Sequence, residues 1–258
     1  MLGAQMPILS ASHWLVTGAA TLGCAVAAQT GTPEGAGLAL PAFSAMAVGP
    51  VQRPWREAGI PKQTLPLTRF DVVEFAGKPV LRVRSDNSYG NLVLEVARVV
   101  PGPQWVLRWS WSLQRGLQDS DLSTKKGDDS PLKVCALFDM PLTDLGLAQR
   151  TKLSIARSLS GEHLPSATLC YVWDRLLPPG SELPNAFSDR VRYIVVANGP
   201  ARPGEWFNYR RTLAADFQRA FGHESAVLPP LLAIAVGADS DNTGGSSLGL
   251  VGDISLTP

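Results

Sequence analysis

The residues best suited to chemistry lie in an acidic stretch near the C-terminus, Asp239-Ser240-Asp241-Asn242-Thr243-Gly244. Oxygen-bearing side chains occupy its first, third and fifth positions and glycine its sixth, as in calcium-binding loops. The twelfth position is Leu250, where an EF-hand needs a bidentate glutamate, so an EF-hand is excluded. We predict that Asp239, Asp241 and Asp253 ligate a calcium ion. The alternative is that these side chains only bond the backbone of a turn.

A second charged group, Lys125-Lys126-Gly127-Asp128-Asp129, comes just before an apolar run. Adjacent carboxylates at the entrance of a strand could bind a cation or the hydroxyls of a sugar. We therefore expect Asp128 and Asp129 to line a cleft near the acidic loop, with Lys126 contacting or neutralising the ligand. The same composition is also typical of an ordinary solvated connection.

Aromatic side chains could supply the stacking surface of a sugar-binding site. Trp173 and Trp206 each lie beside a predicted turn and are our candidates for this role. The alternating row from Trp105 to Leu113 also carries three tryptophans, but its opposite face is polar. We interpret that row as core packing.

Several functional classes are excluded or disfavoured. The net charge is +1 and no cationic cluster is present, which argues against nucleic acid as a partner. Gly245-Ser246-Ser247-Leu248-Gly249 matches a nucleophile motif, but a strand-like run follows it where a helix is required. The later histidines, His163 and His223, lack the spacing of a zinc site. No nucleotide-binding glycine motif is present.

The elements that must position these residues are mostly strands. Two patterns have helical spacing, 144–159 and 209–221, the latter followed by Gly222 as a stop. Because strands and helices do not alternate, we predict an all-β, mainly antiparallel fold, a β-sandwich or jelly roll with one or two short helices. Nine short runs have the apolar pattern of strands: 70–75, 79–84, 91–97, 105–113, 132–138, 167–173, 191–197, 231–237 and 248–256.

The N-terminal part predicts export from a bacterial cell. An apolar run from Trp14 to Ala28 ends in small residues typical of a signal-peptide cleavage site, although no Lys or Arg precedes it. We assign residues 1–28 to a signal peptide, 29–60 to a flexible linker rich in Ala, Gly and Pro, and 61–258 to one β-sandwich domain. The mature protein is expected in the periplasm or outside the cell, with no stable membrane span.

Two cysteines, Cys135 and Cys170, remain after the predicted signal peptide, each within a strand-like run. An oxidising compartment permits a disulfide between them. Buried cysteines also serve as small apolar side chains, so the sequence leaves both states open.

One set of features is found in this chain order: Lys125-Lys126-Gly127-Asp128-Asp129, the 169–173 strand with its Tyr-Val-Trp, residues 195–199, Trp206, the helical pattern with Asp216, the acidic stretch 239–244, and Gly252-Asp253-Ile254. The set resembles the bacterial domain-of-unknown-function family 3047, whose members are exported proteins. The resemblance covers about residues 65–256. It implies that both charged motifs belong to one domain, and it implies no catalytic residues.

We therefore predict a non-catalytic exported protein that binds a glycan or another polar ligand, with a calcium ion as the candidate cofactor. One alternative is a hydrolase or lyase that acts on polysaccharide with Asp128 or Asp129 as acid or base. Another is a structural or assembly partner in the cell envelope. An enzyme should show a cleft with a carboxyl group whose pKa is raised by burial, whereas an assembly partner should expose a sizeable apolar patch.

Overall fold

The computed structural model describes residues 37–60, 63–160 and 164–258. The predicted signal peptide and the first part of the predicted linker lie outside the described residues. No helix within these ranges is long and apolar enough to cross a membrane.

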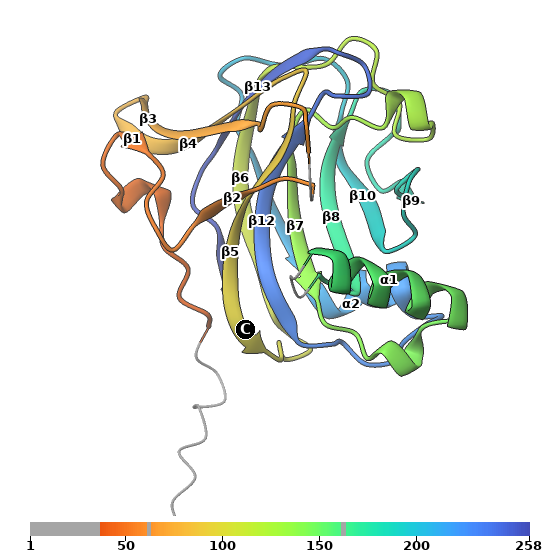
Figure 1. Cartoon of the computed structure of the whole chain (residues 1–258). Coiled ribbons are helices and arrows are strands. Elements are labelled where there is room, and N and C mark those ends of the chain that lie inside the picture. Colours follow the sequence, from red (N-terminus) through yellow and green to blue (C-terminus); the bar gives the residue numbers. More distant parts are fainter. Residues whose placement is uncertain (1–36, 61–62, 161–163) are drawn as a thin grey trace, which may run out of the picture. The chain divides into compact units, whose positions relative to one another are not determined.

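Fourteen strands in the described residues form two sheets that face each other (Figure 1). Every strand pair is antiparallel except β8 with β10, so the predicted mainly antiparallel β-sandwich is confirmed. The first sheet has the order β1 (Gly49–Pro50), β3 (Arg69–Phe75), β4 (Lys78–Asp86), β13 (Ser246–Val251), β6 (Val106–Arg115) and β11 (Phe207–Thr212), with β14 (Ser255–Thr257) also paired to β6. The second sheet has the order β2 (Arg56–Ala58), β5 (Tyr89–Val99), β12 (Leu231–Asp239), β7 (Lys133–Phe138), β8 (Ala167–Asp174), β10 (Val191–Asn198) and β9 (Glu182–Pro184).

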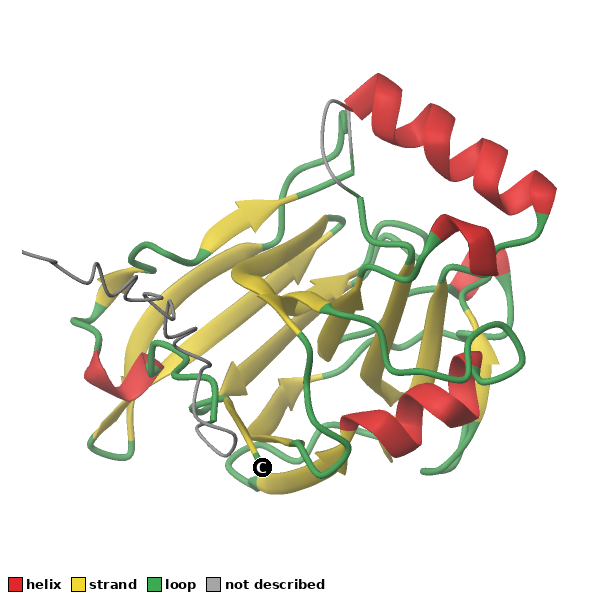
Figure 2. Cartoon of the chain, turned by 90° about the horizontal axis from the view of Figure 1, so that it is seen from below, coloured by secondary structure: helices red, strands yellow, loops and turns green. Residues whose placement is uncertain are grey.

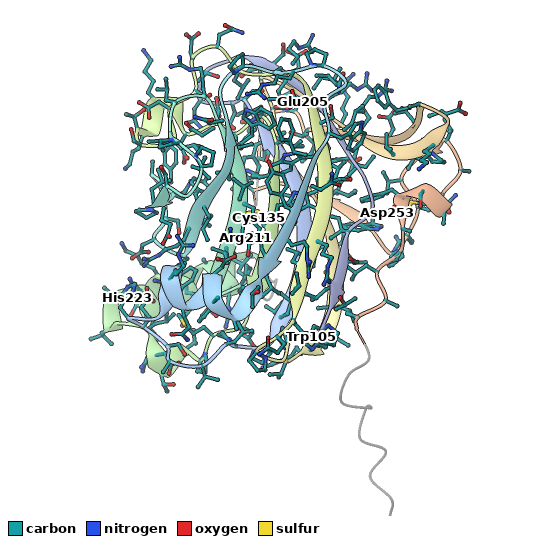
Figure 3. All side chains as sticks on the ribbon, turned by 180° about the vertical axis from the view of Figure 1, so that it is seen from behind. Trp105, Cys135, Glu205, Arg211, His223 and Asp253 are labelled. Carbon is teal, nitrogen blue, oxygen red and sulfur yellow. A yellow bond between two sulfur atoms is a disulfide. The ribbon has the colours of Figure 1, made fainter. Side chains whose placement is uncertain are left out.

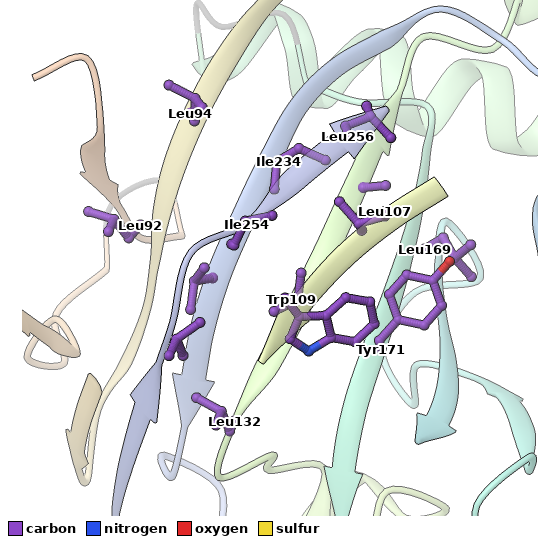
Figure 4. Packing of buried hydrophobic residues seen from close by; sticks show 14 of the residues in the cluster. Leu92, Leu94, Leu107, Trp109, Leu132, Leu169, Tyr171, Ile234, Ile254 and Leu256 are labelled. Carbon is purple, nitrogen blue, oxygen red and sulfur yellow. The ribbon is translucent and has the colours of Figure 1, made fainter. Parts of the chain in front are cut away.

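The core between the sheets follows from the alternation of side chains along each strand. On β6, Trp109 and Trp111 are almost fully buried, which confirms the inward assignment of this row. Trp109 packs against Tyr171 of β8, with 5.0 Å between their ring centroids. Figure 4 shows the two rings next to each other. Aliphatic side chains such as Ile234 fill the space beside them. The two inner faces therefore form one continuous apolar layer.

The described residues contain two α-helices between the strands. Figure 2 shows the helical segments in red. The predicted helix at 144–159 corresponds to α1 (Leu147–Ser160), and single 3₁₀ turns η2 (Lys125–Gly127) and η3 (Leu142–Asp144) precede β7 and α1. The prediction of a helix from residue 209 was wrong at its start, because α2 spans Leu213–Phe221. Residues 209–212 instead extend β11, where Tyr209 stacks on Trp109 at 5.0 Å.

The acidic stretch is not the tip of a hairpin. Its preceding strand, β12, lies in the second sheet, and its following strand, β13, lies in the first. The loop therefore crosses from one sheet to the other. The predicted final strand is also divided, since residues 252–254 separate β13 from β14.

The prediction of a flexible linker up to residue 60 was wrong for residues 37–60. This segment contains η1 (Phe43–Ala45), β1 and β2, and it packs on the sandwich. Phe43 is fully buried and stacks on Trp55 with 5.0 Å between centroids. Leu38 pairs with Leu256 through a β-bridge. The Pro-rich composition hid two aromatic side chains whose burial outweighs the cost of ordering the segment.

We expect Phe43→Ala to lower the free energy of unfolding by about 3–5 kcal/mol, because a fully buried aromatic side chain would be replaced by a cavity. Chemical denaturation would measure the change. Val48→Ala is the control in the same segment, since Val48 is 61% exposed and should change stability by less than about 0.5 kcal/mol. Equal and small effects of both variants would mean that the segment contributes nothing to the domain.

Candidate functional site: a cleft on the outer face of the second sheet

A cleft of about 1010 Å³ lies on the outer face of the second sheet. It is lined by outward-facing residues of β5, β12, β7, β8 and β10. The rim on one side is formed by residues 58–60 after β2, and on the other by residues 185–188 before β10. The size falls within the range of small-ligand sites.

The strand register divides the floor of the cleft into a polar end and an apolar middle. Gly237 of β12 lies between Asn91 of β5 and Lys133 of β7, at the polar end. Two residues away along each strand, Ala235 lies between Val93 and Cys135. Short side chains at these middle positions keep the floor low, which gives the cleft its depth.

A disulfide joins Cys135 and Cys170 on this floor. The two residues are direct partners in the antiparallel ladder of β7 and β8. The bond settles the question that the sequence left open. Disulfides are typical of proteins from oxidising compartments, in agreement with the predicted export.

A buried ion pair forms the centre of the polar end. Nζ of Lys133 lies 2.7 Å from the carboxylate of Asp239, and each side chain is 5% exposed. Gly237 makes this geometry possible, because a Cβ atom there would lie 2.9 Å from Cε of Lys133. Burial alone would lower the pKa of Lys133, but the opposing attraction of Asp239, with Tyr89 and Tyr193, raises it above its ordinary value. Lys133 is therefore charged and committed to Asp239.

The same aspartate holds the loop that carries the second charged group, Lys125-Lys126-Gly127-Asp128-Asp129. The backbone N–H of Ser130 donates to Oδ1 of Asp239 at 2.8 Å, and the N–H of Asp239 donates to the carbonyl of Ser130 at 3.0 Å. The Ser130 hydroxyl donates to the carbonyl of Trp173 at 3.1 Å. The end of β12 and the loop before β7 are thus fixed to each other.

The structure assigns Asp129 to the loop rather than to the cleft. This carboxylate is fully buried and accepts bonds from the backbone N–H groups of Asn242 and Thr243 at 3.1 and 2.8 Å. It also accepts from their side chains at 3.1 and 2.7 Å. The expectation that Asp129 lines the cleft was wrong, because its carboxylate clamps the acidic loop. The contact does bring the two charged motifs together.

Asp128 does line the cleft, and it is 3% exposed. Its Oδ2 accepts a hydrogen bond from the Asn185 amide, while its Oδ1 has no hydrogen-bond partner in the described part of the chain. Burial, and secondly the charge of Asp239, raise the pKa of Asp128 to about 6. The opposing effects of Lys133, Tyr193 and Asn185 are smaller. A carboxyl group of this kind can exchange a proton near neutral pH.

Asn185 connects Asp128 to an aromatic side chain at the rim. The Asn185 side-chain oxygen accepts from the N–H groups of Phe187 and Ser188 at 3.0 and 2.9 Å. Its amide nitrogen also donates to the Tyr193 hydroxyl at 2.8 Å. This turn presents Phe187, which is 60% exposed, at the mouth of the cleft.

Asp241 is the third carboxylate of the polar end. It lines the cleft, and its Oδ1 is buried without a hydrogen-bond partner among the described residues. Burial and then the charge of Asp239 raise its pKa above the ordinary value. Asp128, Asp239 and Asp241 therefore converge on one end of the cleft.

The predicted three-aspartate calcium site does not form. Asp253 lies near η1, where its carboxylate accepts from the Ser44 N–H at 2.9 Å and the Ser44 hydroxyl at 2.5 Å (Figure 3). Asp239 is occupied by Lys133 and Ser130. Within the described ranges, no group of three or more His, Cys, Asp or Glu side chains is placed to hold a metal ion. With Asp239 engaged and Asp253 elsewhere, only Asp241 of the three predicted ligands is left, whereas calcium takes about six to eight oxygen ligands.

Three other predicted ligand-binding residues lie elsewhere. Trp173 is 1% exposed and packs between the sheets, where its indole donates to the carbonyl of Gly199, so its assignment as a stacking residue was wrong. Trp206 lines a second hollow of about 400 Å³ with Asp253. Lys126 is exposed and is not part of the cleft lining.

Five residues of the cleft were not predicted from the sequence: Lys133, Asn185, Phe187 and the two cleft tyrosines, Tyr89 and Tyr193. Lys133 could have been predicted, because it is a charged residue at the start of an otherwise apolar strand pattern. Asn185 and Phe187 lie in a loop with no pattern that marks them.

These observations define a class of protein: a two-sheet β-sandwich with a ligand-sized cleft on the outer face of one sheet. The chain belongs to the family described as "Protein of unknown function (DUF3047)", whose model matches residues 53–255. No curated protein matches the sequence.

Solved structures with a similar architecture include carbohydrate-active proteins. The family 11 carbohydrate-binding module of the cellulosomal cellulase Lic26A-Cel5E from Clostridium thermocellum is 7% identical, with a TM-score of 0.43 over 84% of this chain and 91% of that one. Endoglucanase 3 of Trichoderma harzianum, from family GH12, is 10% identical, with a TM-score of 0.39 over 82% and 92%. At this distance neither activity is transferred to the present chain.

Asp128→Asn should change how stability depends on pH. The folded-state pKa of about 6 exceeds the ordinary value of 3.8, so the stability that this group contributes is complete below about pH 3.8 and is lost as pH rises through about 6. Asparagine stays neutral throughout. We expect the melting temperature of the variant, relative to the native protein, to rise by roughly 5–10 °C between pH 4 and pH 7. Asp119→Asn, at an exposed aspartate, is the control, and a constant difference for Asp128→Asn would contradict the raised pKa.

Proposed function

We propose that the protein binds a glycan in the cleft on the outer face of the second sheet. The observation that carries this proposal is the combination, in one cleft, of an apolar floor, an exposed aromatic ring and carboxylates at one end. The hydrophobic face of a sugar ring can lie on the floor or against Phe187. Its hydroxyls can donate to the carboxylates, since an ionised carboxylate is an acceptor only.

The side chains of the polar end are held in place by contacts within the chain, which favours binding. Lys133 and Asp239 are paired, and Asn185 fixes both Asp128 and the turn of Phe187. A preorganised site avoids much of the entropy cost of ordering side chains on association. Rigid strands supply most of the lining, so the positions of the floor residues are set by the fold.

One observation favours a second candidate function, acid–base catalysis on a polysaccharide. Asp128 has a pKa raised to about 6 and lines the cleft, as a general acid would require. Asp129 takes no part in such a mechanism because its carboxylate is bound by four donors in the loop. Cleavage of a bound oligosaccharide that stops in Asp128→Asn would establish this activity.

Titration calorimetry with a panel of oligosaccharides tests the binding proposal, and Phe187→Ala is the informative variant. We expect binding to weaken by roughly tenfold, the effect of removing an aromatic residue that anchors an interface. Leu176→Ala is the matched control, because Leu176 is 51% exposed and lies outside the cleft lining. If no oligosaccharide binds, or both variants bind like the native protein, the proposed site is refuted.

A further inference from the structure

The charges at the polar end of the cleft do not balance. Three carboxyl groups, those of Asp128, Asp239 and Asp241, face one ammonium group, that of Lys133. Lys133 is bound to Asp239 at 2.7 Å. Neither Asp128 nor Asp241 forms a salt bridge with any residue in the described ranges, and Oδ1 of each lacks a hydrogen-bond partner there.

Such an arrangement is costly in a folded protein. Buried carboxylates are ordinarily paired with cations or fully hydrogen-bonded, and Asp128 is 97% buried by its 3% exposure. The nearby cations are already engaged: Arg56, at the opposite part of the cleft, pairs with Glu95 at 2.7 Å. Lys125 and Lys126 are exposed and lie outside the lining. Nζ of Lys125 lies over the Phe187 ring, 5.6 Å from its centroid, at the mouth of the cleft.

We infer that the glycan recognised in this cleft carries a free amino group, and that its ammonium binds between Asp128 and Asp241. This inference rests on the proposed function. An ammonium group is compact and offers three hydrogen-bond donors, which suits two carboxylates that each have an oxygen without a partner. Uronic acids and sulfated sugars would be repelled by the same groups.

The surrounding groups agree with a cationic ligand. Asp239 lies close enough for its charge to raise the pKa of both Asp128 and Asp241. Around them, Lys133 is neutralised by Asp239, and Tyr193 and Asn185 are uncharged hydrogen-bonding groups. A bound ammonium would stabilise the ionised form of both acids and so lower both pKa values.

The test uses three oligosaccharides of equal length, one of glucosamine units, its fully N-acetylated counterpart, and the glucose oligomer. Titration calorimetry compares their binding to residues 29–258. All titrations use the same pH, which lies below the pKa of the amine so that the amine is charged. We expect the free amine to bind at least about tenfold more tightly than the other two, as a charged hydrogen bond to a buried partner predicts. The preference should disappear in Asp128→Asn with Asp241→Asn, but persist in Asp119→Asn.

The outcomes separate the two proposals. Equal binding of all three oligosaccharides would overturn the amino-sugar inference and leave the glycan cleft standing. Binding of none would overturn both. Calcium chloride alone is the further probe: if calcium raises the melting temperature and displaces the amine, the two carboxylates form a metal site and the inference is overturned. Should the double variant unfold, Asp241→Asn alone, at the more exposed acid, replaces it.

Discussion

The buried ion pair between Lys133 and Asp239 is the interaction on which the polar end of the cleft depends. Through Ser130, Asp239 fixes the loop that carries Asp128 and Asp129, and Asp129 in turn clamps the acidic loop. Removing one partner of such a pair costs about 3–5 kcal/mol, because the other charge stays buried and unpaired. Gly237 leaves room beside the pair, since a Cβ atom there would clash with Oδ1 of Asn91 and lie 2.9 Å from Cε of Lys133. The Lys133–Asp239 pair therefore contributes both to the stability of the protein and to the geometry of the polar end.

The rest of the cleft depends on the second sheet, whose inner face packs in the core and whose outer face forms the cleft floor. Inward residues of β7, β8 and β12 are apolar and form the core, whereas outward residues such as Ala235 and Cys135 are short. Because side chains alternate with period two, the same strands supply both a packed layer and a low floor. The disulfide ties two floor strands without adding bulk. A cleft thus arises without disturbing the sandwich.

Alternation along the chain was enough to predict the sandwich and the inward row of Trp109, because that pattern is local. The predicted start of the second helix at Tyr209 was wrong. Tyr209 stacks on Trp109, and this tertiary contact favours a strand. Both charged motifs were recognised from the sequence. The prediction that Asp253 joins the acidic loop was wrong, because the place of Asp253 depends on β13 belonging to the other sheet. Phe187 was missed because an isolated aromatic residue in a loop carries no periodic signal.

The most direct test of the central claim is a map of backbone amide chemical shifts during titration with a glucosamine oligosaccharide. The account predicts that the shifts concentrate on outward positions of β5, β7 and β12 and on residues 185–188, the floor and rim of the cleft. Shifts concentrated instead around Trp206, on the first sheet, would contradict it. That result would move the binding site to the opposite face of the sandwich.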